Sequence, residues 1–300
     1  VVTDEQHRFG VRQRAALKEK GQSPHMMVMS ATPIPRTLAL MLYGDLDVSI
    51  IDELPPGRKP VKTYHVPPSM KSRVLDFVKR QVAEGRQAYM VCPLVEESDA
   101  IDSQSAVELF ESLRNGELAN LRLGLLHGRM KPQEKERTME AFAAGQVDVL
   151  ISTTVIEVGV NVPNATLMVI ENAERFGLAQ LHQLRGRVGR GEHQAYCILI
   201  ADAKTREVYE RMKIMTKTND GFEIAEKDLK LRGPGDFLGV KQHGLPEFKI
   251  VNLVRDMEIL KEVDVAVNRI LQDMDNPAYK ALLEYTTDKF NKQLAEITLN

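Results

Sequence analysis

The chain has 300 residues, of which 43% are hydrophobic and 27% are charged, and its formal net charge is −2. This near-neutral charge argues against a histone-like or polybasic protein, and 5% aromatic residues without any Trp leave few side chains for a base-stacking platform. No apolar run reaches the roughly 18–20 residues of a membrane-spanning helix, so we expect no membrane association.

The cysteines indicate the cellular compartment, and the first residues indicate which part of a protein the chain represents. Cys92 and Cys197 lie in apolar, strand-like runs without a C-x-x-C pair. Because there is also no signal peptide, we predict reduced core thiols in a cytoplasmic protein. Val1 and Val2 resemble the end of a strand, and no initiator Met precedes them. We therefore interpret the chain as the C-terminal part of a longer protein.

An acidic pair follows the first apolar residues, in the stretch "VVTDEQH". Acidic residues at the end of a strand commonly hold Mg²⁺ and a water in enzymes that split nucleoside triphosphates. Such a site also needs the phosphate-cradling pattern G-x-x-x-x-G-K-[ST], which this sequence lacks. A second apolar run, residues 25–30, ends at Ser30, and the Pro/Gly-rich residues 53–62 predict a linker.

Beyond the linker, apolar strand-like runs alternate with helical stretches. Strands are predicted at residues 88–95, 121–128, 147–153, 165–172 and 195–202, and helices at about 70–84, 103–115, 132–145 and 178–185. Alternation of this kind is typical of a parallel sheet covered on both faces. Residues 63–202 therefore predict one doubly wound α/β domain.

After about residue 203 the pattern becomes helical. Residues 205–218 have a helical period, and the segment from Gly221 begins with helix formers and ends in a Gly-Pro-Gly breaker. A longer amphipathic helix is expected from residue 253. Its apolar face consists of Leu253, Met257, Leu260, Val263, Val267, Ile270, Leu271 and Met274.

The densest chemical signal is the string "QLHQLRGRVGRGEHQ", residues 180–194. It holds Gln183, Arg185, Arg187 and Arg190 within eight residues, with glycines between the arginines. Guanidinium groups bind phosphate oxygens in pairs of hydrogen bonds, and glycines let the backbone approach a ligand. A solvated basic helix end would explain any single arginine, but the whole string after a strand and a helix favours a phosphate site.

Several motifs together resemble superfamily two helicases and translocases. "DEQH" is similar to the Asp-Glu-x-His box, "SAT" to the motif that couples two motor domains, and "STTVIEVGVNVP" to a motif of the second domain. Within the superfamily, residues 29–60, 174–191 and 220–244 resemble the C-terminal half of the RecG family of bacterial branched-DNA helicases. Transcription-repair coupling factors share much of this motor and remain an alternative.

The resemblance implies a motor of two RecA-like domains with ATP in the cleft between them, and a phosphate loop on the first domain. We therefore expect an α/β fold with a parallel sheet. Residues 1–62 would be the remnant of the first RecA-like domain plus the linker. Residues 63–202 would be the complete second domain, and residues 203–300 a translocation hairpin, a loop and C-terminal helices.

For the nucleotide, the resemblance implies roles for the matching residues. Asp4 would hold Mg²⁺ through water, and Glu5 would orient or deprotonate the attacking water. Arg187 and Arg190 would act as arginine fingers on the γ-phosphate, and Gln183 would sense the nucleotide. The turn in the second-domain motif supplies the remaining residues, Glu157, Gly159 and Asn161, the last of which is Asp in many relatives.

For DNA and for coupling, the resemblance implies a second set of residues. His7 would link the acidic box to the nucleic-acid side, and Ser30 and Thr32 would couple the domains, although a plain helix or turn cap is an alternative. Arg232 and Gln242 would belong to the translocation motif, whose hairpin could instead only pack on the motor. The expected DNA contacts are His127, Gly128, Arg129, Thr153 and Thr154.

The function implied by the resemblance is an ATP-dependent, double-stranded-DNA translocase that remodels stalled forks and Holliday junctions in recombination and repair. Its cofactors would be ATP and Mg²⁺, and its partners branched DNA and the rest of the same protein, with the protein a monomer. Without the phosphate loop, this part alone would be inactive. The alternatives are a transcription-repair coupling translocase and a non-catalytic DNA-binding or interaction module.

Overall fold

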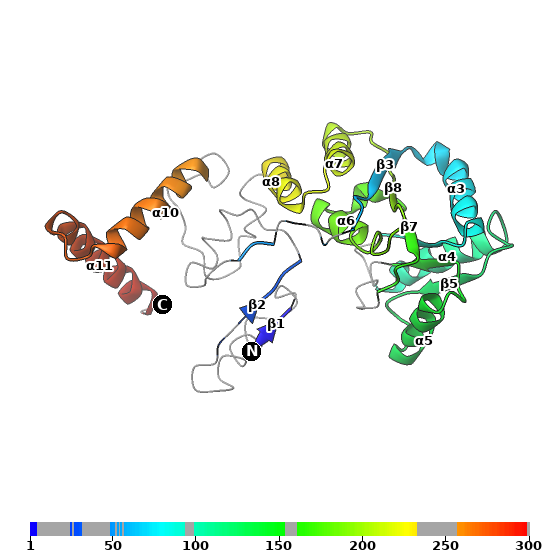
Figure 1. Ribbon diagram of the computed structural model, residues 1–300, viewed down its shortest axis with the longest axis horizontal. Helices are drawn as coiled ribbons and strands as arrows, with labels where there is room; N and C mark the ends of the chain where they lie inside the picture. The colour runs from blue at the N-terminus through cyan, green and yellow to red at the C-terminus, as the bar shows by residue number, and fades with distance from the viewer. Residues whose placement is uncertain are drawn as a thin grey trace. The chain divides into compact units, whose positions relative to one another are not determined.

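The computed structural model describes residues 1–4, 25, 27–31, 49–51, 53, 55, 57–93, 99–153, 161–232 and 257–298 (Figure 1). The chain divides into two compact units, and all described residues up to Arg232 belong to the first. Within it lie a two-stranded parallel sheet and a larger six-stranded sheet. The second unit contains the two C-terminal helices.

The two-stranded sheet joins the first residues to the second apolar run. Strand β1, Val2–Thr3, pairs in parallel with β2, Met27–Val28. The backbone N–H of Met27 donates to Val1 O, and that of Met29 donates to Thr3 O, both at 2.8 Å. The strand predicted at the first residues is therefore confirmed, and the second apolar run contains a strand as well.

The six-stranded sheet is entirely parallel and has the order β3-β8-β7-β4-β6-β5. Its strands are β3 Lys62–Val66, β4 Gln87–Val91, β5 Leu123–Leu126, β6 Val149–Ser152, β7 Ala165–Ile170 and β8 Tyr196–Ile200. All residues of β4, β6 and β7 are buried, as expected for central strands of a sheet covered on both faces. The predicted doubly wound α/β domain is confirmed.

Strand β3 was not among the predicted elements. Its sequence "KTYHV" alternates polar with apolar residues and directly follows the Pro-rich linker, so it gives a weak strand signal. In the structure β3 is an edge strand that pairs only with β8, from Lys62 opposite Tyr196 to Val66 opposite Ile200. An edge strand of this kind tolerates such an alternation because one side of it stays accessible to water.

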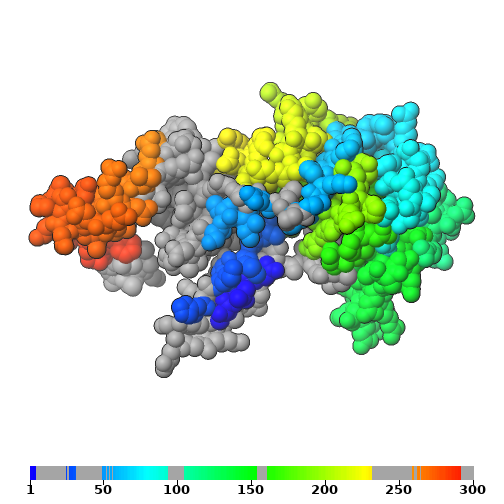
Figure 2. All heavy atoms as spheres, viewed as in Figure 1, coloured from blue at the N-terminus to red at the C-terminus, as the bar shows by residue number. Residues whose placement is uncertain are grey.

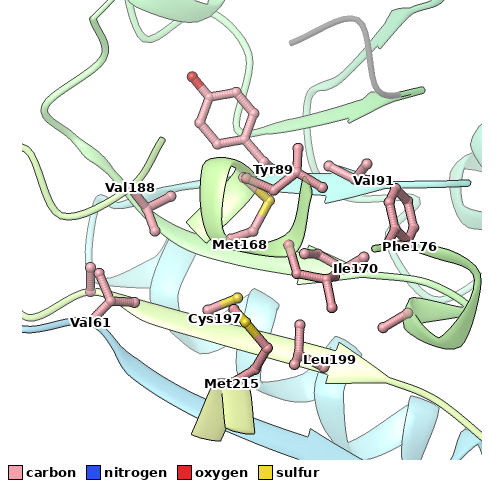
Figure 3. Close-up of a cluster of buried hydrophobic side chains, with 14 of the residues drawn as sticks. Val61, Tyr89, Val91, Met168, Ile170, Phe176, Val188, Cys197, Leu199 and Met215 are labelled. Atoms are coloured by element: carbon pink, nitrogen blue, oxygen red, sulfur yellow. The ribbon is translucent and has the colours of Figure 1, made fainter. Parts of the chain in front are cut away.

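Helices cover both faces of the sheet. Alternate strand residues point to opposite faces, so Ala88 and Met90 pack with α3, Lys71–Ala83, and α4, Asp99–Arg114. Tyr89 and Val91 point to the other face, where α5, Pro132–Ala143, and α6, Leu178–Arg185, lie. Figure 3 shows the side chains of this second layer.

The helical pair α7, Arg206–Lys217, and α8, Gly221–Arg232, belongs to the same core. Thr205 begins α7, because its Oγ1 accepts from Val208 N at 3.3 Å. Met212, Met215 and Ile224 are buried in the layer that contains α6. In Figure 2 the yellow atoms of this pair lie directly against the blue and green atoms of the α/β domain.

The second unit contains α10, Met257–Gln272, and α11, Pro277–Thr298. The predicted amphipathic helix is confirmed from Met257 on, whereas Leu253 lies outside the described residues and Met274 lies beyond the end of α10. Asn276 shapes the turn between the helices, since its Oδ1 accepts from Ala278 N at 3.0 Å and its Nδ2 donates to Asp273 Oδ2 at 2.8 Å. No helix in the described part of the chain is both long and apolar enough to cross a membrane.

Both cysteines are buried and form no disulfide, as predicted. Burial raises the pKa of each thiol, Cys92 and Cys197, to about 12. They are therefore neutral core side chains at physiological pH.

Candidate functional site

The basic string folds into the short helix α6 and the loop that follows it. At the start of α6, Gly177 N donates to the side-chain Oε1 of Gln180 at 3.1 Å. Leu178, Leu181 and Leu184 are buried because their spacing of three residues places them on the face toward the sheet. We call residues 186–195, between α6 and β8, the arginine loop.

Arg185 points inward, although it belongs to the same string. Only 3% of this residue is exposed. Its Nη1 donates to Met215 O and Thr218 O, both at 2.8 Å, and its Nη2 donates to His182 Nδ1 at 3.0 Å. Arg185 therefore joins α6 to the end of α7 and is not available to a ligand.

His182 takes part in this link as an acceptor. Burial, followed by the charge of Arg185, lowers the pKa of His182 to about 4. The imidazole is therefore neutral at physiological pH. Since a guanidinium can only donate, Nδ1 accepts and the ring proton is on Nε2.

Arg187 and Arg190 differ from Arg185 because they remain partly or fully accessible. Arg190 Nε donates to Gly186 O at 3.3 Å. In the described part of the chain, neither guanidinium forms an ion pair with a carboxylate. Gln183, on α6 and partly exposed, lies one helical turn before Arg187.

The backbone that carries these arginines is tightly constrained. Gly189 has φ +74°, which favours glycine, and a Cβ at Gly191 would lie 2.7 Å from Pro163 O. Figure 3 shows Val61 and Val188 at one end of the buried cluster, while the hydroxyl of Tyr89 points away from it. Burial raises the pKa of Tyr89 to about 12, and the charges of Arg190 and Arg187 oppose this effect.

A second group of predicted residues lies at the carboxyl ends of β5 and β6. We call His127, Arg129 and Thr153 the strand-end cluster. Thr153 N donates to Leu126 O at 3.2 Å, which joins the two strand ends. His127 Nδ1 and Thr153 Oγ1 are buried without a hydrogen-bond partner among the described residues. Such groups are uncommon in folded proteins and are expected where a ligand supplies the partner.

The charge of the strand-end cluster is positive. Arg129 is exposed, and Lys135 Nζ donates to Gly128 O at 2.7 Å. Burial lowers the pKa of His127, and the charges of Lys135 and Arg129 lower it further. His127 is therefore neutral at physiological pH, and the cluster offers an N–H, a hydroxyl and a guanidinium to an anion.

Asp4 and Ser30 lie at the same end of the two-stranded sheet. Asp4 directly follows β1, Ser30 follows β2 by two residues, and both are exposed. The strands are parallel, so both residues lie at the carboxyl end. A carboxylate and a hydroxyl oxygen suit Mg²⁺. Among the described residues, no group of three or more His, Cys, Asp or Glu side chains could hold a metal ion.

Of the remaining predicted residues, Asn161 is described and exposed, whereas the others cannot be placed with their side chains. Arg232 is the last residue of α8, and the structure describes its backbone. The others lie outside the described residues: Glu5, His7, Thr32, Thr154, Glu157, Gly159 and Gln242.

Two arginines near the site were not predicted from the sequence. Arg211 of α7 donates through Nη1 to Phe176 O at 3.1 Å and through Nη2 to Glu174 O at 2.9 Å. Arg58, in the linker, donates to the carbonyls of the arginine loop. Both contacts join residues far apart in sequence, and no local motif marks either arginine.

Comparisons with known proteins agree with this geometry. A family model of the helicase conserved C-terminal domain matches residues 70–192, which include the strand-end cluster and Arg187 and Arg190. A second model, the C-terminal part of domain 3 of the ATP-dependent DNA helicase RecG, matches residues 218–296.

Individual relatives cover most of the chain. It is 54% identical over 285 residues to the ATP-dependent DNA helicase RecG of Bacillus subtilis (strain 168), covering 94% of this chain and 42% of that protein. The RecG of Thermotoga maritima is 57% identical over 261 residues, covering 87% of this chain and 34% of that protein.

A solved structure of RecG bound to a three-way DNA junction has a TM-score of 0.67 and 52% identity, covering 87% of this chain and 33% of that chain. The chain thus spans between a third and about two fifths of these relatives. The RecA-like fold of its α/β domain and the RecG-specific match of its helical region lead to one conclusion: the chain belongs to the RecG family of helicases and matches the C-terminal part of its members.

Proposed function

We propose that this chain is the C-terminal motor portion of an ATP-dependent, double-stranded-DNA translocase that unwinds branched DNA at stalled forks and Holliday junctions. The observation that carries the proposal is the arginine loop. Its backbone is fixed, while Arg187 and Arg190 keep accessible guanidiniums without a described carboxylate partner. Two accessible cations on a constrained loop fit the triphosphate of a nucleotide.

On the nucleotide side, each residue has a distinct task. Arg187 and Arg190 would stabilise charge that develops on the γ-phosphate, and Gln183 would sense the nucleotide from α6. Asp4 would hold Mg²⁺ through water, and Glu5 would orient or deprotonate the attacking water. Bound Mg·ATP would supply the phosphoanhydride bond that is hydrolysed.

On the DNA side, we propose that the strand-end cluster binds the phosphate backbone. A neutral imidazole, a hydroxyl and a guanidinium can all donate to phosphate oxygens, and such contacts carry little sequence information. That property suits a motor that moves over any sequence. Support comes from the similar RecG structure, which is bound to a three-way DNA junction.

Between the two sides, we propose that α7 and α8 transmit motion. Arg185 and Arg211 tie α7 to α6 and to the segment before it, so a shift of the arginine loop would reach this helical pair. Arg232 and Gln242 would pass it to the DNA, and Ser30, Thr32 and His7 would couple the acidic box to the second domain.

The proposed organisation keeps residues 1–62 as the end of the first RecA-like domain plus the linker. Residues 63–202 form the second domain, and residues 203–300 the translocation segment. We propose that the whole protein also holds the phosphate loop and a DNA-wedge domain, and that it works as a monomer in the cytoplasm. The RecG-specific model at residues 218–296 favours this function over a transcription-repair coupling translocase.

The test of the proposal compares the 300-residue chain with the full-length protein. Without a phosphate loop, the chain alone should hydrolyse ATP negligibly, whereas the full-length protein should show DNA-stimulated ATPase and junction unwinding. Glu5→Gln in the full-length protein should bind ATP but barely hydrolyse it, because an amide cannot take a proton. Robust DNA-stimulated turnover by the chain alone would contradict the proposed division of the site.

Coupling is tested separately with Gln242→Ala and Arg232→Ala in the full-length protein. Neither residue belongs to the ATP motifs, so junction unwinding should be lost while ATPase is retained. A coupling element needs two arrangements that the nucleotide state biases. A proportional loss of both activities would show that the segment is only a structural brace, and no loss of either would exclude it from translocation.

A further inference from the structure

The end of the linker lies along the arginine loop. Gln194 Nε2 donates to Pro60 O at 2.9 Å, and Lys62 N donates to Ala195 O at 3.0 Å. Val61 is 8% exposed and belongs to the same buried cluster as Val188. Residues 58–62 therefore form a backing for the loop, although more than a hundred residues separate the two segments in the chain.

Arg58 makes the most specific contact in this backing. Its Nε donates to Gly189 O at 3.1 Å and its Nη2 to Gly186 O at 3.4 Å. These two carbonyls lie on either side of Arg187. Because the guanidinium is a planar, rigid fork, one side chain fixes the spacing between them. The half-buried Arg58 thus holds the backbone on which Arg187 is carried.

Arg58 also shares an acceptor with Arg190. Gly186 O accepts from Arg58 Nη2 at 3.4 Å and from Arg190 Nε at 3.3 Å. A displacement of the linker would therefore change the hydrogen bond that orients Arg190. The loop has little freedom to compensate, since a Cβ at Gly189 would lie 3.1 Å from Val61 Cγ2.

The charges around Arg58 argue against a purely structural tie. Burial lowers the pKa of Arg190, and the neighbouring charges of Arg187 and Arg58 lower it further. Three guanidiniums within mutual influence repel one another, so this arrangement costs free energy in the absence of an anion. A neutral donor could hold the same carbonyls without that cost.

We propose that Arg58 is a positioning residue for Arg187 and Arg190, through which the linker between the two motor domains sets the placement of both arginines. This inference rests on the proposed function, because it assigns to Arg58 an effect on the same site. When the linker takes up its position beside β8, Arg58 aligns the two carbonyls and thereby both side chains. When the linker moves away, the loop loses that alignment.

The test measures DNA-stimulated ATPase of the full-length protein with Arg58→Ala and Arg58→Lys. Both should lower kcat at least tenfold and change the KM for ATP less than twofold, because an alignment effect acts on the transition state. Lysine keeps the charge but lacks the fork, so Arg58→Lys should restore only part of the loss. Arg86→Ala is the matched control, since Arg86 is also half-buried and donates to Asn164 Oδ1 at 3.0 Å.

The triple variant Arg58→Ala/Arg187→Ala/Arg190→Ala separates this inference from the proposed function. If Arg58 acts only through Arg187 and Arg190, the triple variant should be no slower than the double variant Arg187→Ala/Arg190→Ala. Multiplied losses, or Arg58 variants that match Arg86→Ala in kcat, would overturn the inference while leaving the proposed function intact. Normal turnover of both Arg187→Ala and Arg190→Ala would instead overturn the proposed function. Arg58→Lys with an unchanged circular dichroism spectrum guards against a folding defect.

Discussion

The two ends of the neighbouring strands β5 and β6 differ in whether their polar side chains have hydrogen-bond partners among the described residues. At the amino ends, Arg122 donates through Nε and its backbone N to Asp148 Oδ2 at 3.1 and 2.8 Å. Gln87 Nε2 donates to Phe142 O at 2.6 Å and to Val147 O at 2.8 Å. At the carboxyl ends, His127 Nδ1 and Thr153 Oγ1 are buried without partners among the described residues.

This difference distinguishes polar side chains that stabilise the fold from polar side chains that are available to a ligand. A buried donor or acceptor without a partner costs about 1–3 kcal/mol, so a fold selected only for stability would pair or remove it. The amino ends follow that rule. Among the described residues the carboxyl ends do not, which is consistent with a ligand that supplies partners for His127 Nδ1 and Thr153 Oγ1. The arginine loop combines both behaviours, because its carbonyls are paired while Arg187 and Arg190 remain accessible.

The largest expected effect tests the accessible arginines. Arg187→Ala in the full-length protein should lower DNA-stimulated ATPase on the order of 10³–10⁵-fold, as removal of arginine fingers does in related chemistry. The thermal midpoint should change little, because Arg187 forms no ion pair with a described residue. Steady-state ATPase and calorimetry measure the two quantities. A loss of activity that follows a loss of stability would contradict the role.

The next effect concerns a paired group, His182. Its pKa in the folded chain is about 4, below the ordinary 6.5, so the unfolded chain binds more protons between these values. Stability is therefore fully present above pH 6.5 and falls as the pH decreases toward 4, by at most about 3 kcal/mol. Urea unfolding at pH 7.5 and 5.0, followed by circular dichroism, measures the loss.

His182→Gln is the control for this prediction, because the glutamine does not titrate. The variant should lose the corresponding pH dependence of the free energy of unfolding. His127→Gln provides a comparison at the strand-end cluster, where burial also lowers the pKa of the histidine but no guanidinium donates to its Nδ1 among the described residues. An equal effect of both variants would contradict the contrast between the two regions.

A smaller effect compares one paired and one unpaired polar side chain directly. Gln87→Leu removes the donor to one buried and one partly buried carbonyl and should lower the free energy of unfolding by about 2 kcal/mol. Thr153→Val removes a buried hydroxyl that has no described partner, so it should be neutral or slightly stabilising. The same urea experiment measures both. A Thr153→Val variant that is as unstable as Gln87→Leu would refute the interpretation of the carboxyl ends.

Local patterns in the sequence were sufficient to predict most of the fold. Strands β4 to β8 are short apolar runs, and α5 has Pro132 at its first turn, so each element carries its own signal. Strand β3 escaped prediction because its stability comes from pairing with β8, which lies more than a hundred residues away. Its alternation of polar and apolar residues is only five residues long and directly follows the Pro-rich linker, so it gave too weak a signal for a strand.

For the candidate site too, local sequence patterns were sufficient for some features and long-range contacts determined the others. The string around α6 was sufficient to predict a phosphate site, but it could not show that Arg185 faces inward while Arg187 and Arg190 do not. That difference depends on where α6 ends and on the carbonyls of Met215 and Thr218. Arg58 and Arg211 were missed for a related reason. Each donates hydrogen bonds to backbone carbonyls. Because every residue has a backbone carbonyl, the sequence does not show which of them will accept.

The smallest expected effect concerns DNA binding at the strand-end cluster. Arg129 is exposed, so its guanidinium is accessible to a phosphate from the solvent. If it neutralises one phosphate, Arg129→Ala in the full-length protein should weaken DNA binding a few-fold and reduce the slope of log K against log salt by about 1.

Arg122→Ala is the matched control for this prediction, because Arg122 lies at the amino ends of β5 and β6 and is held by Asp148. It should lower stability but leave the slope unchanged. Since the slope counts the phosphates that are neutralised, it separates a lost contact from a distorted fold, which weakens binding at every salt concentration alike. An equal change of slope in both variants would mean that DNA does not distinguish the two ends of the sheet.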